Sequence, residues 1–532
     1  MGANSTNCPT HKIDSNVVGS SYAEEKCIGQ LPDGVAPDDE LGAIWRPVDP
    51  NEFDDFGGEI TMVARNPISS SRQRKKGIVT NVEATGGLNI DVTPSSLPRL
   101  MQGFCFADAR EGQSTAPISD DITKTVTVTS VVGAGTVLNV GAGDGARFKV
   151  GDILKLSGFT NPANNRSDII VNAIAGDALS VAGAFVDETA TAEVKLETVG
   201  FKFAVSSLRI DVVGAAVSLT RSSGSFIDDN YHVGEWLFIG GDLAPNQFGL
   251  NKPGYARVHA VTAGKLTLKE PTWAAPATDV GATKTIHIYR GTYIRNENDV
   301  SLIKRRTYHW ERTLGQDNNG VQSEYLVGSV ANEFSLNITA ADKMTADLSY
   351  YAQTNELRNG LQGLKAGDRS ETISATEDAY NTSSNVYQMR LFIDDPDTIT
   401  PGSIYAKVME STVTINNGAS GLNAIGDLGS FDINIGDFEV GGEIEAYFST
   451  VEAVRAVKNN ADVGFNIVAA NDNTGFIFDI PLLSLGGGKV TVEKDEPIKL
   501  PVETSGAENE NGYTLSCTFF GYLPDIAMPT VV

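Results

Sequence analysis

The residues best able to do chemistry are scattered along this 532-residue sequence and form no motif. The five histidines lie far apart, and none stands in a metal-binding or nucleophile motif. The four cysteines are equally dispersed, unlike a disulfide framework or a zinc site. The sequence therefore predicts a protein that is not an enzyme, with no catalytic residues, metal or cofactor. The residues concerned are His11, His232, His259, His287 and His309, and Cys8, Cys27, Cys105 and Cys517.

Two short motifs resemble ligand-binding loops. Gly141-Ala142-Gly143-Asp144-Gly145 is similar to a phosphate loop, but no Lys-Ser/Thr pair and no helix are expected after it. Asp317-Asn318-Asn319-Gly320 is rich in oxygen ligands but lacks the spacing of an EF-hand, and Asn-Gly is typical of hairpins. We predict a turn at each.

Two clusters of cations are the best candidates for a functional surface. Arg72-Gln73-Arg74-Lys75-Lys76 lies in a Ser-rich loop between predicted strands, and Lys304-Arg305-Arg306 directly precedes another. Long cationic side chains can reach carboxylates of a neighbouring subunit, so the interpretations are an inter-subunit contact or a solvated loop. Direct DNA binding is disfavoured because interleaved aromatic residues are missing. The candidate contact residues are Arg65, Arg72, Arg74, Lys75, Lys76, Lys304, Arg305 and Arg306.

The composition is acidic and rich in glycine. The net charge is 41 − 67 = −26, and the 54 glycines favour turns and strands. The acidity has two interpretations: solubility, or an acidic wall past which a polyanion slides without binding. No apolar run approaches the roughly 20 residues of a membrane span, and the polar start lacks a secretory signal. We expect synthesis and assembly in the host cytoplasm.

A degenerate internal repeat is the strongest pattern. Phe148–Leu154 returns as Tyr231–Leu237, at an offset of 233 − 150 = 83 residues, and Val171–Ile174 returns as Val258–Val261. Each copy alternates short apolar runs with Gly, Asn and Asp, which is typical of strands joined by tight turns. The pattern predicts two tandem small β-barrels or sandwiches inserted in a longer β body. Their aromatic residues Trp236, Trp273 and Tyr255 are expected in the core rather than on a ligand-binding platform.

The body is predicted on both sides of this insertion. Short apolar runs at Glu59–Val63, Ile78–Val82, Leu88–Val92, Glu324–Val327 and Phe334–Ile338 predict strands. We predict a mainly β fold with these divisions: a polar N-terminal arm over 1–40, the first part of the body over 41–118, β modules over 119–200 and 201–292, and the rest of the body over 293–532, with a candidate second half over 385–532.

Two helices are expected to flank the body strands. Thr93–Met101 contains a capping residue and proline near its first turn, and Val451–Asn459 follows a capping box and carries one apolar stripe. Each follows a strand that starts with Gly-Gly, at Gly86 and at Gly441. The body is therefore either doubled or single, and the signature is too short to decide.

Several separated motifs carry a resemblance to a known family. They are Trp45–Pro47, Val63–Ile68, Ser71–Gly77, Ile303–Tyr308, Gly320–Gly328, Asp437–Gly442 and Asp479–Gly488. Together they resemble the tail tube (major tail) proteins of long-tailed, siphovirus-like bacteriophages. The similarity covers most of residues 41–532.

The resemblance implies a β-barrel or β-sandwich body with flanking short helices. It implies rings of three or six chains, stacked axially into a hollow tube in the virion tail, with DNA as an unbound passenger. The implied partners are the chain itself and the tail terminator, tape-measure and distal tail proteins, and no membrane. A non-contractile tail is favoured.

Two other functions stay open. A β-rich decoration or adhesion protein on a phage head or tail would explain the duplicated modules, and it predicts discrete oligomers in solution. A carbohydrate-active enzyme would require paired carboxylates facing a cleft.

Overall fold

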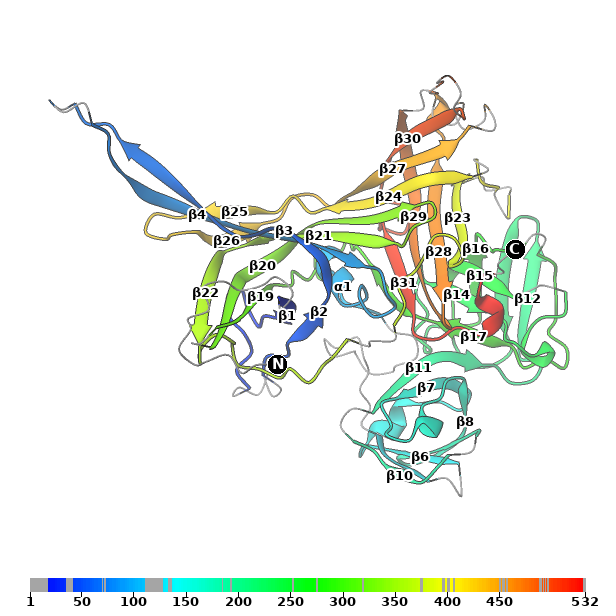
Figure 1. Cartoon of the computed structure of the whole chain (residues 1–532). Coiled ribbons are helices and arrows are strands. Elements are labelled where there is room, and N and C mark those ends of the chain that lie inside the picture. The colour runs from blue at the N-terminus through cyan, green and yellow to red at the C-terminus, as the bar shows by residue number, and fades with distance from the viewer. Residues whose placement is uncertain are drawn as a thin grey trace.

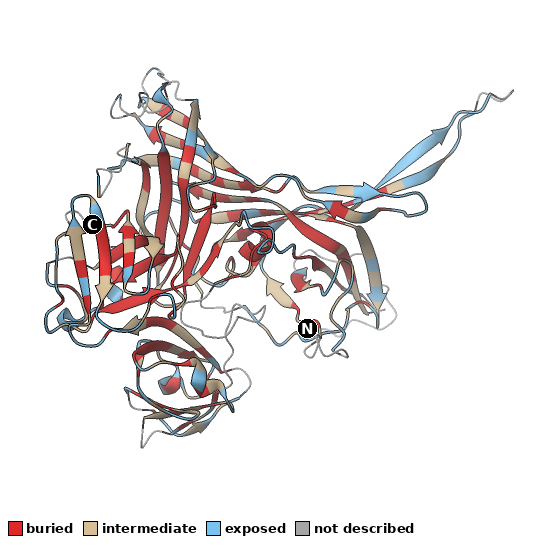
Figure 2. Cartoon of the chain, turned by 180° about the vertical axis from the view of Figure 1, so that it is seen from behind, coloured by how far each residue is buried: buried red, intermediate tan, exposed pale blue. Residues whose placement is uncertain are grey.

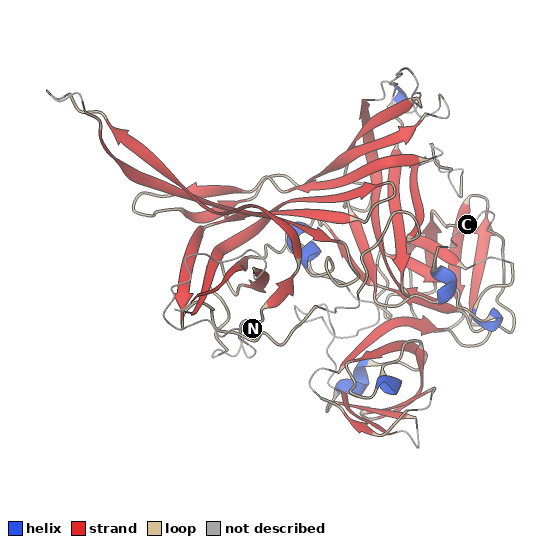
Figure 3. Ribbon diagram, viewed as in Figure 1, coloured by secondary structure: helices blue, strands red, loops and turns tan. Residues whose placement is uncertain are grey.

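The computed structural model of the chain consists almost entirely of antiparallel strands, with few and short helices (Figure 3). The prediction of a mainly β protein is confirmed. Two large sheets and one separate hairpin contain all the named strands. The structure describes residues 18–34, 42–68, 70, 73–110, 128–132, 136–183, 185–191, 194–250, 253–273, 276–317, 320–373, 377–394, 398–399, 402–404, 407–448, 451, 455, 458–487, 490, 492, 494 and 497–529.

The body is a 16-stranded sheet drawn from both ends of the chain. Its strands are β1 (Gly19–Glu24), β2 (Arg46–Val48), β3 (Pro50–Arg65), β4 (Lys75–Asp91), β18 (Thr292–Arg295), β19 (Tyr308–Asp317), β20 (Gly320–Thr339), β21 (Thr345–Ala352), β22 (Thr354–Gly360), β23 (Val386–Ile393), β24 (Val408–Asn416), β27 (Glu439–Tyr447), β28 (Val463–Asn471), β29 (Thr474–Gly487), β30 (Lys499–Gly506) and β31 (Ser516–Phe520). Its central strands pair consecutively in the order β3, β4, β21, β20, β24, β27, β30, β29.

A 13-stranded sheet forms between the two parts of the body. Its strands are β5 (Val128–Val132), β6 (Val137–Val140), β7 (Asp152–Ser157), β8 (Ile169–Ala175), β9 (Ala178–Val181), β10 (Glu188–Thr189), β11 (Lys195–Lys202), β12 (Leu208–Val213), β13 (Ala216–Arg221), β14 (Trp236–Ile239), β15 (Gly254–Val261), β16 (Lys265–Lys269) and β17 (His287–Arg290). The remaining elements are the hairpin of β25 (Ser420–Asn423) and β26 (Ser430–Asn434), helix α1 (Leu100–Phe104), and the 3₁₀ turns η2 (Asp144–Arg147), η3 (Pro162–Asn164), η4 (Ala244–Asn246) and η5 (Asp525–Ala527).

The sequence repeat corresponds to a repeated strand order. The first copy pairs as β5-β6-β9-β8-β7-β11 and the second as β12-β13-β16-β15-β14-β17, joined through β11 and β17. The same turn opens β7 and β14: Gly151 N–H donates to the Val171 carbonyl at 2.9 Å, and Gly234 N–H donates to the Val258 carbonyl at 2.7 Å. Both glycines have positive φ, +105° and +91°, which explains the repeated glycine. The predicted domain boundaries and module shapes stay predictions.

Several predicted strands are parts of longer ones. Ile78–Val82 and Leu88–Val92 belong mostly to the single strand β4, and Glu324–Val327 and Phe334–Ile338 belong to β20. Gly86 and Gly87 lie within β4 and do not end it. Each is a glycine at a point where neighbouring atoms approach the backbone closely. A Cβ at Gly86 would lie 2.2 Å from Leu326 Cδ1, and one at Gly87 would lie 2.7 Å from the Asp54 carbonyl oxygen.

The first predicted helix lies later than expected. The residues from Thr93 to Arg99 form turns, and α1 begins at Leu100. Proline at 98 disfavours helical geometry at Leu97, and Ser96 Oγ accepts a 2.9 Å hydrogen bond from Thr93 N–H that closes a turn instead. The second predicted helix, Val451–Asn459, falls largely outside the described residues. Arg455 N–H does donate to the Val451 carbonyl at 2.9 Å, as in a helix.

The main hydrophobic core lies between the body sheet and α1. Leu100, Met101 and Phe104 of α1 join Phe334 and Leu336 of β20 in this core. Figure 2 shows buried residues through the middle of the sheet, whereas the long β3–β4 hairpin is largely exposed. In the second module Trp236, Tyr255 and Trp273 are buried, so their prediction as core residues is confirmed.

Candidate assembly surfaces

The body sheet has one apolar face and one acidic face. Along β21, Ala346, Leu348 and Tyr350 are buried, whereas Asp347 and Ser349 between them are not. This period of two places every second side chain on the face away from the core. The carboxylates on that polar face are Asp91, Glu333, Asp347, Glu410, Glu439, Glu443, Glu445 and Glu503.

Some of these carboxylates face one another directly. Glu443 of β27 is the register partner of Glu503 on β30, and Glu410 of β24 is the partner of Glu445 on β27. Lys499 Nζ lies 3.6 Å from Glu445 Oε1 and offsets part of the negative charge. Like charges directly opposite each other destabilise a strand pair. Folding alone therefore gives no reason for these two pairs.

Several strands of the sheet have an unpaired edge within the described part of the chain, and two of them, β3 and β29, are strands of the consecutive central order. β3 pairs with β4 on one side, and no described strand lies on its other side. In β29, Ser484–Gly487 pair with β30 on one side and with no described strand on the other. Unpaired N–H and C=O groups along a strand edge can bind another strand.

The β3–β4 hairpin extends far beyond the body as an arm (Figure 1). Arg65 lies opposite Lys75 near its tip, and Arg65, Arg74, Lys75 and Lys76 are all exposed. Arg72 falls outside the described residues. The arm also exposes the large apolar residues Ile60, Met62, Val63, Ile78 and Val79. Clustered apolar exposure on a projecting hairpin indicates a contact surface.

The second basic cluster has partners within its own chain. Lys304 forms an ion pair with Asp108, and Arg305 Nη2 donates to Asp432 Oδ1 at 2.8 Å. Arg306 is buried, forms an ion pair with Glu24, and donates through Nη2 to Asp108 Oδ1 at 2.6 Å. These contacts join β1, the segment after α1 and β26. An inter-subunit role for this cluster stays a prediction.

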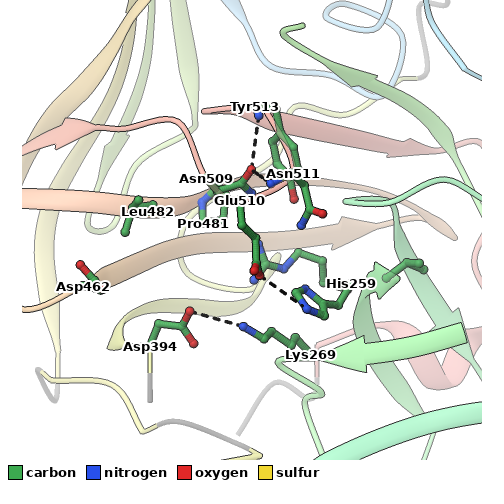
Figure 4. A pocket seen from close by; sticks show the side chains of 12 residues that line it. His259, Lys269, Asp394, Asp462, Pro481, Leu482, Asn509, Glu510, Asn511 and Tyr513 are labelled. Atoms are coloured by element: carbon green, nitrogen blue, oxygen red, sulfur yellow. Dashed lines mark hydrogen bonds and ion pairs between the residues drawn. The ribbon is translucent and has the colours of Figure 1, made fainter. Parts of the chain in front are cut away.

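A pocket of about 260 Å³ lies where the second module meets the body (Figure 4). Two polar contacts cross it: Lys269 Nζ forms an ion pair with Asp394 Oδ2 at 3.5 Å, and His259 Nε2 lies 3.5 Å from Glu510 Oε1. Burial and the nearby Lys269 lower the pKa of His259. The lining residues are Arg257, Val258, His259, Lys269, Asp394, Asp462, Pro481, Leu482, Asn509, Glu510, Asn511 and Tyr513.

Buried charged residues beside this pocket form contacts between the second module and the body sheet. Arg257 forms an ion pair with Glu270, and its Nη1 lies 3.3 Å from Asp479 Oδ2 on β29. Burial raises the pKa of Asp479 to about 7, although Arg257 opposes this shift. Opposite charges pair across the pocket and beside it, so we interpret the pocket as a polar joint.

The first loop motif forms turns, as predicted. Asp177 Oδ1 accepts hydrogen bonds from Gly143 N–H at 3.0 Å and Gly145 N–H at 3.1 Å, so these N–H groups bind a carboxylate of their own chain. In the second motif the ladder between β19 and β20 ends at Asp317 and Gly320, and Asn318 and Asn319 lie outside the described residues. Among the described residues, no group of three or more His, Cys, Asp or Glu side chains is arranged to hold a metal ion.

The sequence analysis left an acidic wall open as one interpretation of the net charge but did not name its residues, although a local signal for them is present. In Glu443-Ile444-Glu445-Ala446, acidic and apolar residues alternate with the period of a strand. The free edges have no comparable local signal, because strand pairing brings together distant residues.

The fold defines a β-rich protein whose main sheet has an acidic face, unpaired strand edges and a projecting arm. The profile of a protein family described as phage tail tube protein matches residues 15–506, and the chain belongs to this family. It is therefore a structural component of a phage tail. No curated protein matches the chain significantly. In the described residues, no helix is long and apolar enough to cross a membrane.

Proposed function

We propose that this chain forms rings that stack into the hollow tail tube through which the phage genome passes. The acidic face of the body sheet is the observation that carries the proposal. Helix α1 and the main hydrophobic core cover the apolar face of the body sheet, which is opposite the acidic face. The acidic face is therefore the side free to line a channel.

An acidic lining suits a channel for DNA. Neutralising phosphates with Lys and Arg is what holds DNA on a protein, whereas carboxylates repel it. The like-charge pairs Glu443–Glu503 and Glu410–Glu445 concentrate negative charge along neighbouring strands. A duplex in such a channel stays centred and hydrated, and moves without being trapped.

Lateral assembly uses the free strand edges. Pairing β3 and β29 with strands of neighbouring subunits removes edges that otherwise promote aggregation. A heterologous contact of this kind forms a ring when its rotation closes. The sheets then become one continuous barrel around the channel.

Axial assembly uses the arm. Its tip carries Arg65, Arg74, Lys75 and Lys76, and these cations, together with Arg72 of the same sequence cluster, can form charge-assisted pairs with carboxylates of the next ring. The exposed apolar residues along the arm add buried area when rings stack. At the ends of the tube the same surfaces meet the tail terminator, distal tail and tape-measure proteins. Assembly takes place in the host cytoplasm, and the proposal includes no catalytic step or cofactor.

Electron microscopy of the purified chain tests the proposal. We expect filaments of constant diameter with a stain-filled channel and an axial repeat of stacked rings. Discrete particles that never extend would instead support a decoration or adhesion protein. A stable monomer, under conditions that include high protein concentration and moderate salt, would overturn the proposed function.

A further inference from the structure

The body contains two copies of one folding unit. The first consists of β1, β3, β4 and β19–β22, and the second of β23, β24 and β27–β31. Six strand pairings of the first unit recur in the second in the same chain order. They are β1–β19 and β23–β28, β19–β20 and β28–β29, β20–β21 and β29–β30, β20–β22 and β29–β31, β4–β21 and β27–β30, and β3–β4 and β24–β27.

Other features follow the same correspondence. Helix α1 follows β4, and the helical hydrogen bond from Arg455 to Val451 follows β27. The outer parts of β3 and β4 form the arm, and the β24–β27 connection contains the β25–β26 hairpin, which extends in the same direction (Figure 1). The β5–β17 sheet interrupts the first unit alone.

One pairing joins the two units within the chain. β20 of the first unit pairs with β24 of the second, from Glu333 with Asn416 to Thr339 with Glu410. The counterpart of β20 is β29, and the counterpart of β24 is β3. Each of these two counterparts, β29 and β3, has a free edge in the described part of the molecule, and they are the two end strands of the consecutive order from β3 to β29.

We propose that β29 of one copy pairs with β3 of the next, repeating the β20–β24 contact, and that three copies close the ring. The inference rests on the proposed function and adds the contact strands and the number of chains. Because the contact within the chain and the contact between chains are equivalent, three chains present six similar units. The arms and inserted modules then occur three times per ring, at alternate positions.

The size of the channel selects three copies. Each chain supplies eight consecutively paired strands, from β3 to β29. With strands about 4.8 Å apart and tilted by about 40°, two copies give a barrel radius of about 16 Å and three give about 24 Å. Side chains occupy roughly 6 Å of either radius, and a bare duplex needs about 10 Å. Three is therefore the smallest number of copies that leaves space for hydrated DNA.

Cysteine cross-linking tests the contact and the number together. Glu52 and Asp54 of β3 and Ser484 of β29 are exposed residues near the free edges. The background chain has Cys8 and Cys27 replaced by serine. Two double-cysteine variants are made in it: Ser484→Cys with Glu52→Cys, and Ser484→Cys with Asp54→Cys. Each variant is treated with a short bismaleimide. Denaturing gels then report the covalent products, and electron microscopy of the same samples reports tubes.

We expect covalent dimers and trimers, with the trimer as the final product. The pair Ser335→Cys with Thr414→Cys, partners in the β20–β24 register, is the control for the reagent and should cross-link within one chain. Products that continue to six chains would overturn the ring of three. Tubes without cross-links from either pair would overturn the β29–β3 contact while leaving the proposed function standing. An absence of both tubes and cross-links would count against both.

Discussion

Glu443 lies directly opposite Glu503 across the antiparallel pair β27–β30, with both side chains exposed on the sheet face away from the core. The next strand pair repeats the arrangement with Glu410 and Glu445. A sheet selected only for stability would place opposite charges at such positions. A channel for a polyanion requires the arrangement that is found.

Replacing Glu443 with lysine should raise the stability of the sheet but impair the passage of DNA. The Glu443→Lys chain gains an opposite-charge pair with Glu503, so its free energy of unfolding should rise by about 0.5 kcal/mol in urea denaturation of the unassembled chain. Tubes of this variant should retain duplex DNA in sedimentation at low salt, whereas wild-type tubes should not. Glu443→Gln is the uncharged control. Equal DNA retention by all three proteins would argue against an acidic channel.

Removing cations from the arm should weaken ring stacking. The Lys75→Ser/Lys76→Ser chain should form shorter tubes in electron microscopy, with a larger deficit at low salt, because the lost ion pairs are screened less there. Lys195→Ser/Lys265→Ser makes the same change in net charge at exposed positions in the inserted modules. Tubes of wild-type length from the arm variant, or equal shortening in both variants, would contradict the stacking role.

Removing the charge of Glu235 should destabilise the second module. Glu235 accepts a hydrogen bond from His232 N–H at 3.1 Å. It also accepts from Arg290 Nε at 2.6 Å and Nη2 at 2.7 Å in a fully buried pair. Glu235→Gln should therefore cost about 3–5 kcal/mol, because it leaves the Arg290 charge buried without its partner.

Hydrogen exchange resolved by module measures this effect. For Glu235→Gln, protection should fall mainly over 208–290 and little over 128–202. The variant should still form tubes, because the body sheet is unchanged. Wild-type protection over 208–290 would show that the buried Arg290 pair contributes nothing.

Acid should destabilise the second module through His287. Burial lowers the pKa of His287 to about 4. Between about pH 6.5 and 4 the unfolded chain therefore binds a proton that the folded chain does not, and the free energy of unfolding falls as pH decreases. At pH 5 the loss from this residue is about 2 kcal/mol.

Comparison with His287→Gln isolates this effect. Between pH 7.5 and pH 5 the wild-type chain should lose about 2 kcal/mol more than the variant in denaturant titrations. Asp168, which accepts from Tyr289 Oη at 3.1 Å, has a raised pKa because of burial and has the opposite pH dependence. It is present in both proteins, so its contribution cancels. Parallel pH profiles would refute the role of His287.

Local patterns in the sequence predicted much of the fold. The Gly151 and Gly234 turns were detectable because each occupies a few consecutive residues and recurs with its strands. The full length of β20 could not be predicted, because Gly328 in its interior is a residue that usually ends a strand and has a φ of +68°. Whether Arg306 would be exposed or buried depended on Glu24 and Asp108, which are distant in the chain.

The sequence by itself determined that the chain is acidic and mainly β, that it carries a degenerate internal repeat, and that cations cluster over 72–76. These properties are local, since composition, period and turn residues act within a few positions. The tertiary structure alone decided that Glu443 faces Glu503, and that the edges of β3 and β29 are free whereas those of β20 and β24 are joined. Strand pairing between distant segments determines those outcomes, and no single segment contains that information.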